Sequence, residues 1–396
     1  MSDLFGRVSV PGRPPVADPY RVMVVDDSAV IRGLLTRALE GDPEIRVVAS
    51  VGDGQMAVNS LQRNSAIDVI VLDVEMPVMD GLTAIPKLLA VSPAVKIIMA
   101  STLTVRNADI SLRALQAGAA DYIAKPTTTR EISGAEAFRA ELVSKVKVLG
   151  LAARRSGGGP RQRPEARTAA APLAATSFGA VAGLRLRPEP VAPTLRPISG
   201  VPARPDVIAI GSSTGGPQAL FEVLSHLKGG ISQPILITQH MPATFTAILA
   251  EHISRQCGVS CSEAKDGESV VVNRAYVAPG DFHMTVVSRS GGLVIALAKD
   301  PPENFCRPAV DPMMRSLVKA YGRKILAVIL TGMGQDGMRG CQEVVAAGGM
   351  VIGQDEGTSV VWGMPGAVAN AGLCSAILPL KEIGPYIRKI ASRSVA

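Results

Sequence analysis

The chain has 396 residues, of which 47% are hydrophobic and only 3% are aromatic, and its net charge is +7. The length allows two or three domains, and the aliphatic composition favours α/β packing. No apolar run approaches the roughly 18 residues that cross a bilayer, and the first residues lack the apolar stretch of a secretory signal. We therefore expect a cytoplasmic protein with no direct membrane insertion.

The excess positive charge is confined to one segment. Residues 151–204 contain nine arginines, no lysine and two glutamates, whereas residues 1–150 and 205–396 carry net charges of −1 and +1. The same segment is rich in Pro, Ala and Gly, and such a composition buries too little apolar surface to offset the entropy lost on ordering. We predict an N-terminal tail at 1–20, a flexible linker at 149–204 and no nucleic-acid partner.

Residues 21–148 alternate apolar segments with helical patterns, which predicts a first α/β domain. The expected strands lie at 21–27, 44–50, 68–74, 96–102 and 121–126. Helical patterns separate these strands, and a further helix is expected at 131–149. Such alternation with short connections is typical of a doubly wound parallel sheet.

Polar side chains collect where the strands of this first domain end. Asp26 and Asp27 follow the first strand, Asp73 ends the third, Ser101 ends the fourth and Lys125 follows the fifth. Ligands gather at the carboxyl ends of parallel strands, so these groups should share one rim. Three carboxylates repel one another unless a cation neutralises them, and Mg²⁺ suits carboxylate and phosphate oxygens. The simpler alternative for either of the first two aspartates alone is a helix N-cap.

The segments VVDDS, LDVEMPVMDG, MAST and AKP resemble the receiver domains of response regulators. The resemblance implies that Asp73 accepts a phosphoryl group from a histidine kinase and that Mg²⁺ is needed for this step. It assigns the magnesium ligands to Asp26, Asp27, Asp73 and the backbone carbonyl of Glu75. It also assigns the residues that respond to the phosphate: Ser101, Tyr122 and Lys125.

Residues 205–396 predict a second α/β domain. Strand candidates lie at 206–213, 234–240, 324–332 and 348–355, with helical patterns between them. Residues 268–300 alternate instead in the manner of antiparallel hairpins and predict a β insertion. The expected fold class is α/β, with two doubly wound parallel-sheet domains, the first of them flavodoxin-like, joined by the linker.

The segment GSSTGG, residues 211–216, leads from the first of these strands into a helix that starts near Pro217. It fits the G-x-S-x-G pattern of a nucleophile turn, with Ser213 at its centre. Small residues at any tight turn satisfy this pattern. A phosphate cradle or a plain helix cap is therefore an alternative, although the lysine of a Walker loop is absent.

A serine nucleophile needs a base within hydrogen-bond reach. His240 ends a predicted strand and should reach the same rim as Ser213, and His283 is the alternative base. His226 and His252 lie on predicted helices and are expected at the surface.

The base in turn needs a carboxylate that orients it. Asp336 follows the strand at 324–332 and should reach the same rim, and Asp355 is the alternative acid. A cysteine nucleophile is disfavoured, because neither Cys306 nor Cys341 sits in a clear strand-end turn.

Six segments resemble, in order, the sequence blocks of the chemotaxis protein-glutamate methylesterases, in which a receiver domain regulates a serine hydrolase. They are IGSSTGGPQAL, ITQHMP, AYVAPGDFHM, RPAVD, LTGMGQDG and WGMPGAVANAG. With the receiver, the resemblance covers roughly residues 21–140 and 206–375. It implies that Ser213 is the nucleophile, His240 the base and Asp336 the orienting acid.

The resemblance extends to the residues around the nucleophile. It implies that backbone amides around Met333 form an oxyanion hole and that Thr214 lines the site. One departure is Ser212, which stands where the family usually has alanine and places two hydroxyls side by side.

The implied function is a phosphorylation-activated serine hydrolase for sensory adaptation in chemotaxis. It would demethylate glutamate γ-methyl esters on methyl-accepting chemoreceptors, and also deamidate receptor glutamines, without a cofactor for ester hydrolysis. Two alternatives belong to other classes. A DNA-binding output domain would carry a basic face, yet residues 205–396 have a net charge of only +1. A non-catalytic binding module would need neither His240 nor Asp336.

Overall fold

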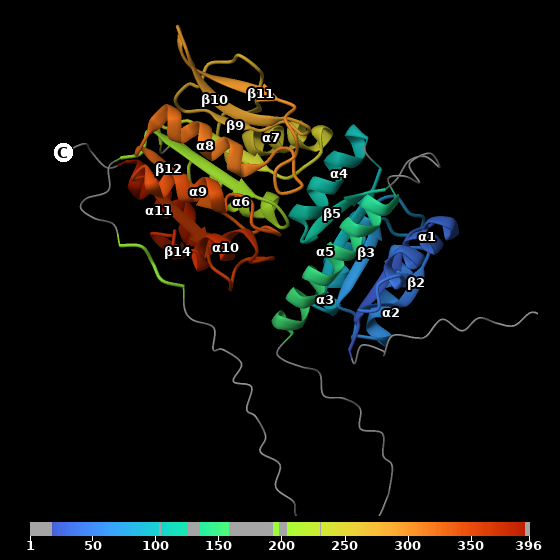
Figure 1. The fold of residues 1–396 in the computed structure, drawn as a ribbon. Helices are drawn as coiled ribbons and strands as arrows, with labels where there is room; N and C mark the ends of the chain where they lie inside the picture. The colour runs from blue at the N-terminus through green and yellow to red at the C-terminus, as the bar shows by residue number, and fades with distance from the viewer. Residues whose placement is uncertain are drawn as a thin grey trace, which may run out of the picture.

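The computed structural model describes residues 18–102, 104–125, 135–157, 193–197, 204–229 and 231–392. These residues form two α/β domains that lie side by side (Figure 1). Most of the predicted tail and most of the predicted linker lie outside them.

The first domain has a five-stranded parallel sheet in the order β2-β1-β3-β4-β5. Its strands are Tyr20–Val25 (β1), Ile45–Val51 (β2), Val69–Asp73 (β3), Lys96–Ser101 (β4) and Asp121–Ala124 (β5). Its helices are Ala29–Glu40 (α1), Gly54–Arg63 (α2), Gly81–Val91 (α3), Val105–Gln116 (α4) and Ala135–Ser156 (α5). The strand order reverses between β1 and β3, which confirms the doubly wound, flavodoxin-like topology.

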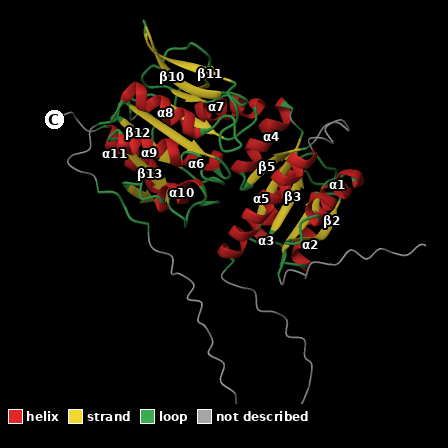
Figure 2. Cartoon of the chain, viewed as in Figure 1, coloured by secondary structure: helices red, strands yellow, loops and turns green. Residues whose placement is uncertain are grey.

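The second domain has a seven-stranded sheet in the order β14-β13-β12-β6-β7-β9-β8, with every neighbouring pair parallel. Its strands are Val207–Ser212 (β6), Ile235–Gln239 (β7), Cys261–Glu263 (β8), Ala275–Val277 (β9), Ile325–Ile329 (β12), Met350–Gln354 (β13) and Ala376–Leu378 (β14). Its helices are Gly216–Ser225 (α6), Ala243–Cys257 (α7), Val310–Tyr321 (α8), Met338–Ala346 (α9), Met364–Asn370 (α10) and Leu380–Ala391 (α11). Figure 2 shows these helices packed around the sheet.

The insertion in the second domain is smaller than the sequence predicts. Strands His283–Arg289 (β10) and Gly292–Ala298 (β11) form the expected antiparallel hairpin. The expectation of hairpins throughout residues 268–300 is wrong for β9, which pairs in parallel with β7 and β8 inside the main sheet. A strand of three residues is too short for its alternation to reveal whether its neighbours run parallel or antiparallel.

The first domain turns α4, β5 and α5 toward the second (Figure 1). Tyr122 of β5 stacks on Phe245 of α7, with ring centroids 4.4 Å apart and an interplanar angle of 12°. Buried apolar side chains of both domains join in one continuous cluster. The two domains are therefore joined by packed apolar side chains as well as by the chain itself.

The prediction that His252 lies at the surface is wrong. This α7 side chain is only 1% exposed, and its Nε2 lies 2.8 Å from Oδ1 of Asp109 on α4. Gln116, also on α4, lies 3.4 Å from its Nδ1. The pattern of one helix cannot reveal a partner contributed by another domain. The side chain of His226 is 41% exposed, as expected.

Helix α5 runs to Ser156, so the predicted start of the linker at 149 falls inside this helix. Arg154, on its last turns, forms an ion pair with Asp68 at 3.0 Å and anchors the helix to the first domain. Residues 193–197, also within the predicted linker, contact the second domain, where Arg196 donates to the carbonyl of Gly349 at 2.7 Å. Within the described part of the chain, no helix combines the length and apolar character that crossing a membrane requires.

Candidate functional site

Three carboxylates meet at the switch point of the first sheet, as the sequence predicts. Ligating oxygens of Asp26, Asp27 and Asp73 all lie within 4.8 Å of one another. Lys125 Nζ lies 2.6 Å from Asp26 Oδ2 and 2.7 Å from Asp73 Oδ1. The helix-cap alternative does not explain this cluster, because the N-cap of α1 is Ser28 and not an aspartate.

The donor chemistry of this cluster fits a hard divalent cation. Mg²⁺ prefers oxygen ligands, and Asp26, Asp27 and Asp73 supply carboxylate oxygens close enough to share one ion. Burial raises the pKa of Asp73 above its ordinary value, more than the ion pair with Lys125 lowers it. A nearby cation would favour the ionised form of Asp73. Glu75, expected to ligate through its carbonyl, uses its side chain in an exposed ion pair with Arg106 at 3.3 Å.

The residues predicted to respond to the phosphate are Lys125, which belongs to this cluster, and Ser101 and Tyr122. The Ser101 hydroxyl is buried and lies 3.0 Å from the hydroxyl of Ser111 on α4. Tyr122 is 6% exposed and stacks on Phe245, as described above. Its carbonyl accepts a hydrogen bond from Lys145 at 2.6 Å. Strand β5, which carries Tyr122, is thus part of the contact between the domains.

The GSSTGG turn leads from β6 into α6 beside the switch point of the second sheet, where β6 lies next to β12. The Ser213 amide donates to the carbonyl of Thr331, just past β12, at 3.0 Å. Gly215 has φ of +75°, which favours glycine, and starts the helix without a side-chain cap. A Cβ on Gly216 would meet Gln239 Oε1 at 1.9 Å, so a larger residue there would displace the Gln239 side chain that holds the turn.

The two adjacent serines have different surroundings. Ser212 is fully buried, and its hydroxyl donates to Gln239 Oε1 at 2.7 Å. Ser213 is partly exposed, and among the described residues its hydroxyl has no hydrogen-bond partner. Gln239 also donates to the carbonyl of Ser213 at 2.9 Å and fixes the turn. Ser213 is therefore the hydroxyl that a substrate can reach.

His240 and Asp336 form a buried pair at the same rim. Nε2 of His240 lies 2.8 Å from Oδ2 of Asp336. The backbone amide of His240 donates to the carbonyl of Ser212 at 3.2 Å, so the histidine follows its strand directly beside the serine turn. The sequence predicts this pairing, and the fold brings the two residues together from segments 96 positions apart.

Asp336 is held by donors on several sides. The amide of Val310, at the start of α8, donates to Oδ2 at 2.6 Å, and the amides of Asp311 and Gly337 donate to Oδ1. The side chain of Asn304 also donates to Oδ1, at 2.9 Å. Burial alone would raise the pKa of Asp336, but His240 and these amides lower it below its ordinary value. Asp336 is thus a fixed anion.

The imidazole of His240 has a second partner that sequence reasoning dismissed. Cys306 Sγ lies 3.3 Å from its Nδ1. Burial disfavours the charged imidazolium, but the hydrogen bonds with Asp336 and Cys306 outweigh this and raise the pKa of His240 above 6.5. With Nε2 donating to the Asp336 carboxylate, Nδ1 is the basic nitrogen.

The alternative base and acid have structural roles. His283 is 2% exposed, its Nε2 lies 3.1 Å from the carbonyl of Pro301, and its Nδ1 accepts from the amide of Ala309 at 3.2 Å. Asp355 accepts from the amide of Thr358 at 3.0 Å and shapes the loop after β13. Neither contacts His240 in the described hydrogen bonds.

The loop after β12 supplies backbone amides next to the serine turn. A Cβ on Gly332 would lie 2.9 Å from Cβ of Ser213, which shows how closely this loop approaches. The Gly332 amide donates to Val361, but the amides of Met333 and Gly334 have no hydrogen bond to any described residue. These amides suit an oxyanion, as expected for Met333.

The first domain reaches the residue next to Ser213. Thr214, expected to line the site, donates from its buried hydroxyl to Asp121 Oδ2 at 2.7 Å. Lys145 of α5 lies 3.2 Å from the same carboxylate oxygen. Ser144 lies 3.5 Å from the sulfur of Met333. The contact between the domains therefore includes both the serine turn and the loop with the free amides.

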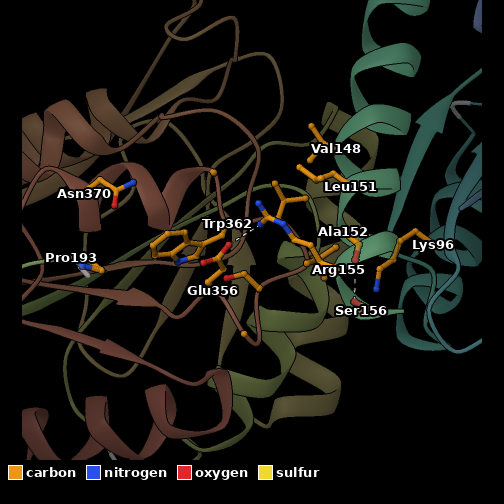
Figure 3. A pocket seen from close by; sticks show the side chains of 15 residues that line it. Lys96, Val148, Leu151, Ala152, Arg155, Ser156, Pro193, Glu356, Trp362 and Asn370 are labelled. Carbon is orange, nitrogen blue, oxygen red and sulfur yellow. Dashed lines mark hydrogen bonds and ion pairs between the residues drawn. The ribbon is translucent and has the colours of Figure 1, made fainter. Parts of the chain in front are cut away.

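A cleft of about 1140 Å³ opens between α5 and the loop that leads into α10 (Figure 3). Figure 3 shows Arg155 of α5 reaching Glu356 across it, at 2.7 Å. Trp362 lies on the wall of the cleft opposite α5. The loop that carries Trp362 forms a short parallel bridge with Gly332, in the loop after β12. The cleft is lined by residues of both domains and by none of the proposed catalytic residues Ser213, His240 and Asp336.

Sequence reasoning missed the groups that come from another domain or from an irregular loop. Neither Asp121 nor Lys145 stands out in the sequence, because no periodicity indicates that Asp121 meets Thr214 or that Lys145 joins them. The signal available for Cys306 was its position before Arg307-Pro308, but its nearness to His240 depends on the path of an irregular loop.

Both domains match known families. Residues 22–135 match the model of the response regulator receiver domain, and residues 208–387 match that of the CheB methylesterase. A crystal structure of the Thermotoga maritima CheB methylesterase catalytic domain is 39% identical and covers 47% of this chain and 98% of that chain, with a TM-score of 0.46.

Similar proteins extend over the whole chain. A protein-glutamate methylesterase/protein-glutamine glutaminase of Azospirillum brasilense is 72% identical over 405 residues and covers 100% of both chains. A protein of the same name from a group 2 operon of Rhodospirillum centenum is 66% identical over 397 residues, again with 100% of both chains covered. The chain therefore belongs to the protein-glutamate methylesterase/protein-glutamine glutaminase family of chemotaxis enzymes, in which a response regulator receiver domain is joined to a CheB methylesterase domain.

Proposed function

We propose that Ser213 is the nucleophile of a methylesterase site in which His240 is the base and Asp336 orients it. The observation that carries this proposal is the 2.8 Å contact between His240 and Asp336 at the strand ends that flank the Ser213 turn. Ser213 is the accessible hydroxyl, since Ser212 is buried and hydrogen-bonded to Gln239. The order Ser, His, Asp along the chain differs from that of α/β-hydrolases, but roles follow geometry rather than order.

The reaction is acyl transfer in two steps. Nδ1 of His240 takes the proton of the Ser213 hydroxyl as its oxygen attacks the γ-carbonyl carbon of a methylated glutamate. The amides of Met333 and Gly334 stabilise the oxyanion that develops. The imidazolium then protonates the leaving oxygen, methanol departs, and an acyl-enzyme forms. Water, deprotonated by the same imidazole, releases the glutamate carboxylate and free Ser213.

The substrates follow from the family. We infer that the esters are carried by methyl-accepting chemoreceptors, and that glutamines at the same receptor positions are deamidated by the same acyl transfer, with ammonia as the leaving group. Neither step needs a cofactor, because the nucleophile, base and oxyanion donors all come from the chain. We infer that the enzyme acts in the cytoplasm, as expected from the sequence.

The first domain would control access to this site. We infer that a chemotaxis histidine kinase supplies the phosphoryl group to Asp73. Bound Mg²⁺ would offset the charge of the phosphate, and Asp26, Asp27, Asp73 and the Glu75 carbonyl would hold it. Lys125, which pairs with Asp73, and Ser101 would contact the phosphate. Their movement would reach Tyr122 and Asp121, which contact the second domain at Phe245 and Thr214.

A direct assay tests the proposed chemistry. Methylated receptor membranes are incubated with the full chain, and released methanol is measured for the wild type and for the variants Ser213→Ala, Ser212→Ala and His240→Ala. The proposal expects methanol release to be abolished by Ser213→Ala and His240→Ala but retained by Ser212→Ala. Activity in Ser213→Ala with its loss in Ser212→Ala would move the nucleophile to the neighbouring serine.

A further inference from the structure

We propose that Cys306 is a site of reversible oxidation that switches the esterase off by capturing the basic nitrogen of His240. This inference rests on the proposed role of His240 as the base. The carrying observation is the 3.3 Å distance between Cys306 Sγ and His240 Nδ1, the nitrogen that Ser213 needs. The ligand class is a small hydroperoxide, which reacts with activated thiols.

The thiol is held in place by the loop that also anchors the acid. Glu303 and Cys306 exchange backbone hydrogen bonds of 3.1 and 2.9 Å and close a tight turn. Between them, Asn304 donates to Asp336 and has φ of +51°, and Phe305 has φ of +64° with its side chain fully exposed. Positive φ at two successive non-glycine residues is uncommon and costs energy, and such strain often lies at functional sites. The turn brings the Cys306 sulfur to His240, while Phe305 at the tip of the turn lies in solvent.

The other four cysteines lack this environment. Burial raises the pKa of Cys257 to about 11 and that of Cys374 to about 12, and it also raises the pKa of Cys341 well above its ordinary value. Cys261 is half-buried like Cys306, yet burial raises its pKa to about 12 and it has no imidazole partner. Within the described residues, only Cys306 combines partial exposure with a base in hydrogen-bond contact. A thiol beside an imidazole can pass its proton to that base and react as the thiolate.

The oxidation balances without another cofactor. The proton of the Cys306 thiol moves to Nδ1 of His240, and the sulfur attacks one oxygen of the hydroperoxide. An S–O bond forms as the O–O bond breaks, so the sulfur loses two electrons and the peroxide gains them. The leaving oxygen takes the proton back from the imidazolium and departs as water or an alcohol. The product is a sulfenic acid beside a neutral imidazole.

This product would block the base. The hydroxyl of the sulfenic acid is a stronger donor than a thiol and lies beside Nδ1, so it competes with the Ser213 hydroxyl for that nitrogen. The added oxygen also occupies space between the loop and the imidazole. Reduction by a small thiol restores Cys306 and frees the base, because a sulfenic acid is reversible.

The test treats the full chain with hydrogen peroxide, traps sulfenic acids with dimedone and measures the adduct at each cysteine by peptide mass spectrometry. Methanol release is followed in parallel, before and after reduction with dithiothreitol. Cys306→Ala is the test variant, and Cys261→Ala is the matched control. We expect the adduct to form at Cys306 at least about tenfold faster than at Cys261. The wild type and Cys261→Ala should lose activity and regain it on reduction, whereas Cys306→Ala should keep its own starting rate.

Two results would overturn the proposal: equal adduct formation at Cys306 and Cys261, or peroxide inactivation of Cys306→Ala at the wild-type rate. Adduct formation at Cys306 with no loss of activity would refute the switch as well. The adduct readout does not depend on ester hydrolysis, so a failure of the proposed function appears separately, as methanol release by untreated Ser213→Ala. In His240→Ala, adduct formation at Cys306 should slow, because the imidazole that takes the thiol proton is gone.

Discussion

The two candidate sites lie at the same position in two parallel sheets, yet their carboxylates differ in the number of hydrogen-bond donors around them and in the direction of their pKa shifts. Among the residues that the structure describes, Asp73, at the switch point of the first sheet, accepts only from Lys125 and the Val74 amide, and burial raises its pKa. Asp336, at the switch point of the second, accepts from three amides, Asn304 and His240, and its pKa is lowered.

The difference fits the role proposed for each carboxylate. A carboxylate that orients a base must keep its charge and its place, so it is surrounded by donors that leave it no freedom. A carboxylate that accepts a phosphoryl group must offer a free oxygen and share its charge with a cation, so it is left with few partners. The position in the sheet sets where chemistry happens, and the donor count sets which chemistry it is.

The largest effect on activity is expected when the proposed nucleophile is removed. Ser213→Ala should lower methanol release by about 10⁴–10⁶-fold, because no covalent intermediate can form, whereas Ser212→Ala should change it little. Single-turnover rates on methylated receptor membranes measure both variants. An active Ser213→Ala variant would show that the buried Ser212 reacts, against its hydrogen bond to Gln239.

Removing the charge of the orienting acid should have the next largest effect. Asp336→Asn keeps the shape but should lower kcat/KM by roughly 10³–10⁴-fold, because the imidazole loses its orientation and the developing imidazolium its partner.

The same variant tests the pH dependence. The base must be neutral, and the pKa of His240 is raised, so wild-type kcat/KM should still be climbing with pH above 6.5. In Asp336→Asn the pKa of His240 falls, so the acidic limb of the pH profile should move to lower pH. An unmoved limb would show that another group controls it.

The contact between the two sites is tested by Asp121→Asn. Loss of the charge weakens the hydrogen bond to Thr214 and so destabilises the state in which the two domains are in contact. If the free energy of that state rises by about 1.4 kcal/mol, the rate of the unphosphorylated protein should rise about tenfold. Asp109→Asn is the matched control. Its contact with His252 also joins the domains, but Asp109 is 42% exposed and does not contact the serine turn in the described hydrogen bonds, so its effect should be smaller. Equal basal rates for Asp121→Asn and the wild type would show that the contact between Asp121 and Thr214 does not limit the activity of the unphosphorylated protein.

The smallest effect is expected at the exposed edge of the cleft. The side chains of Arg155 and Glu356 are 62% and 54% exposed, and such ion pairs contribute little. Arg155→Gln should therefore change the basal rate by no more than about twofold. A change as large as that of Asp121→Asn would mean that the cleft, and not the serine turn, holds the domains together.

Sequence reasoning reached the residues whose place follows from a strand end. Asp26, Asp73, His240 and Asp336 each end or closely follow an apolar strand, and parallel strands bring such residues to one rim without further information. The topology therefore followed from the alternation of elements. The same logic failed for β9, whose three residues carry too little pattern to separate a parallel strand from a hairpin.

The rest depends on contacts that no local pattern encodes. His252 was expected in solvent because its partner, Asp109, lies in the other domain, 143 positions away. Cys306 was set aside because it follows no strand, yet a tight turn brings its sulfur to the imidazole. The sequence pattern favours Ser213 over Ser212 as the nucleophile, and the hydrogen bond from Ser212 to Gln239, which no pattern predicts, supports that choice.

One measurement tests most directly whether phosphorylation at the first site releases the second. Methanol release from methylated receptor membranes is measured at saturating substrate for the full wild-type chain and for Asp73→Asn, each with and without an acyl phosphate and Mg²⁺. The account predicts that the phosphodonor raises the wild-type rate about tenfold or more, which requires only about 1.4 kcal/mol of differential stabilisation, and leaves Asp73→Asn at its low basal rate. An equal response of the two proteins would contradict it.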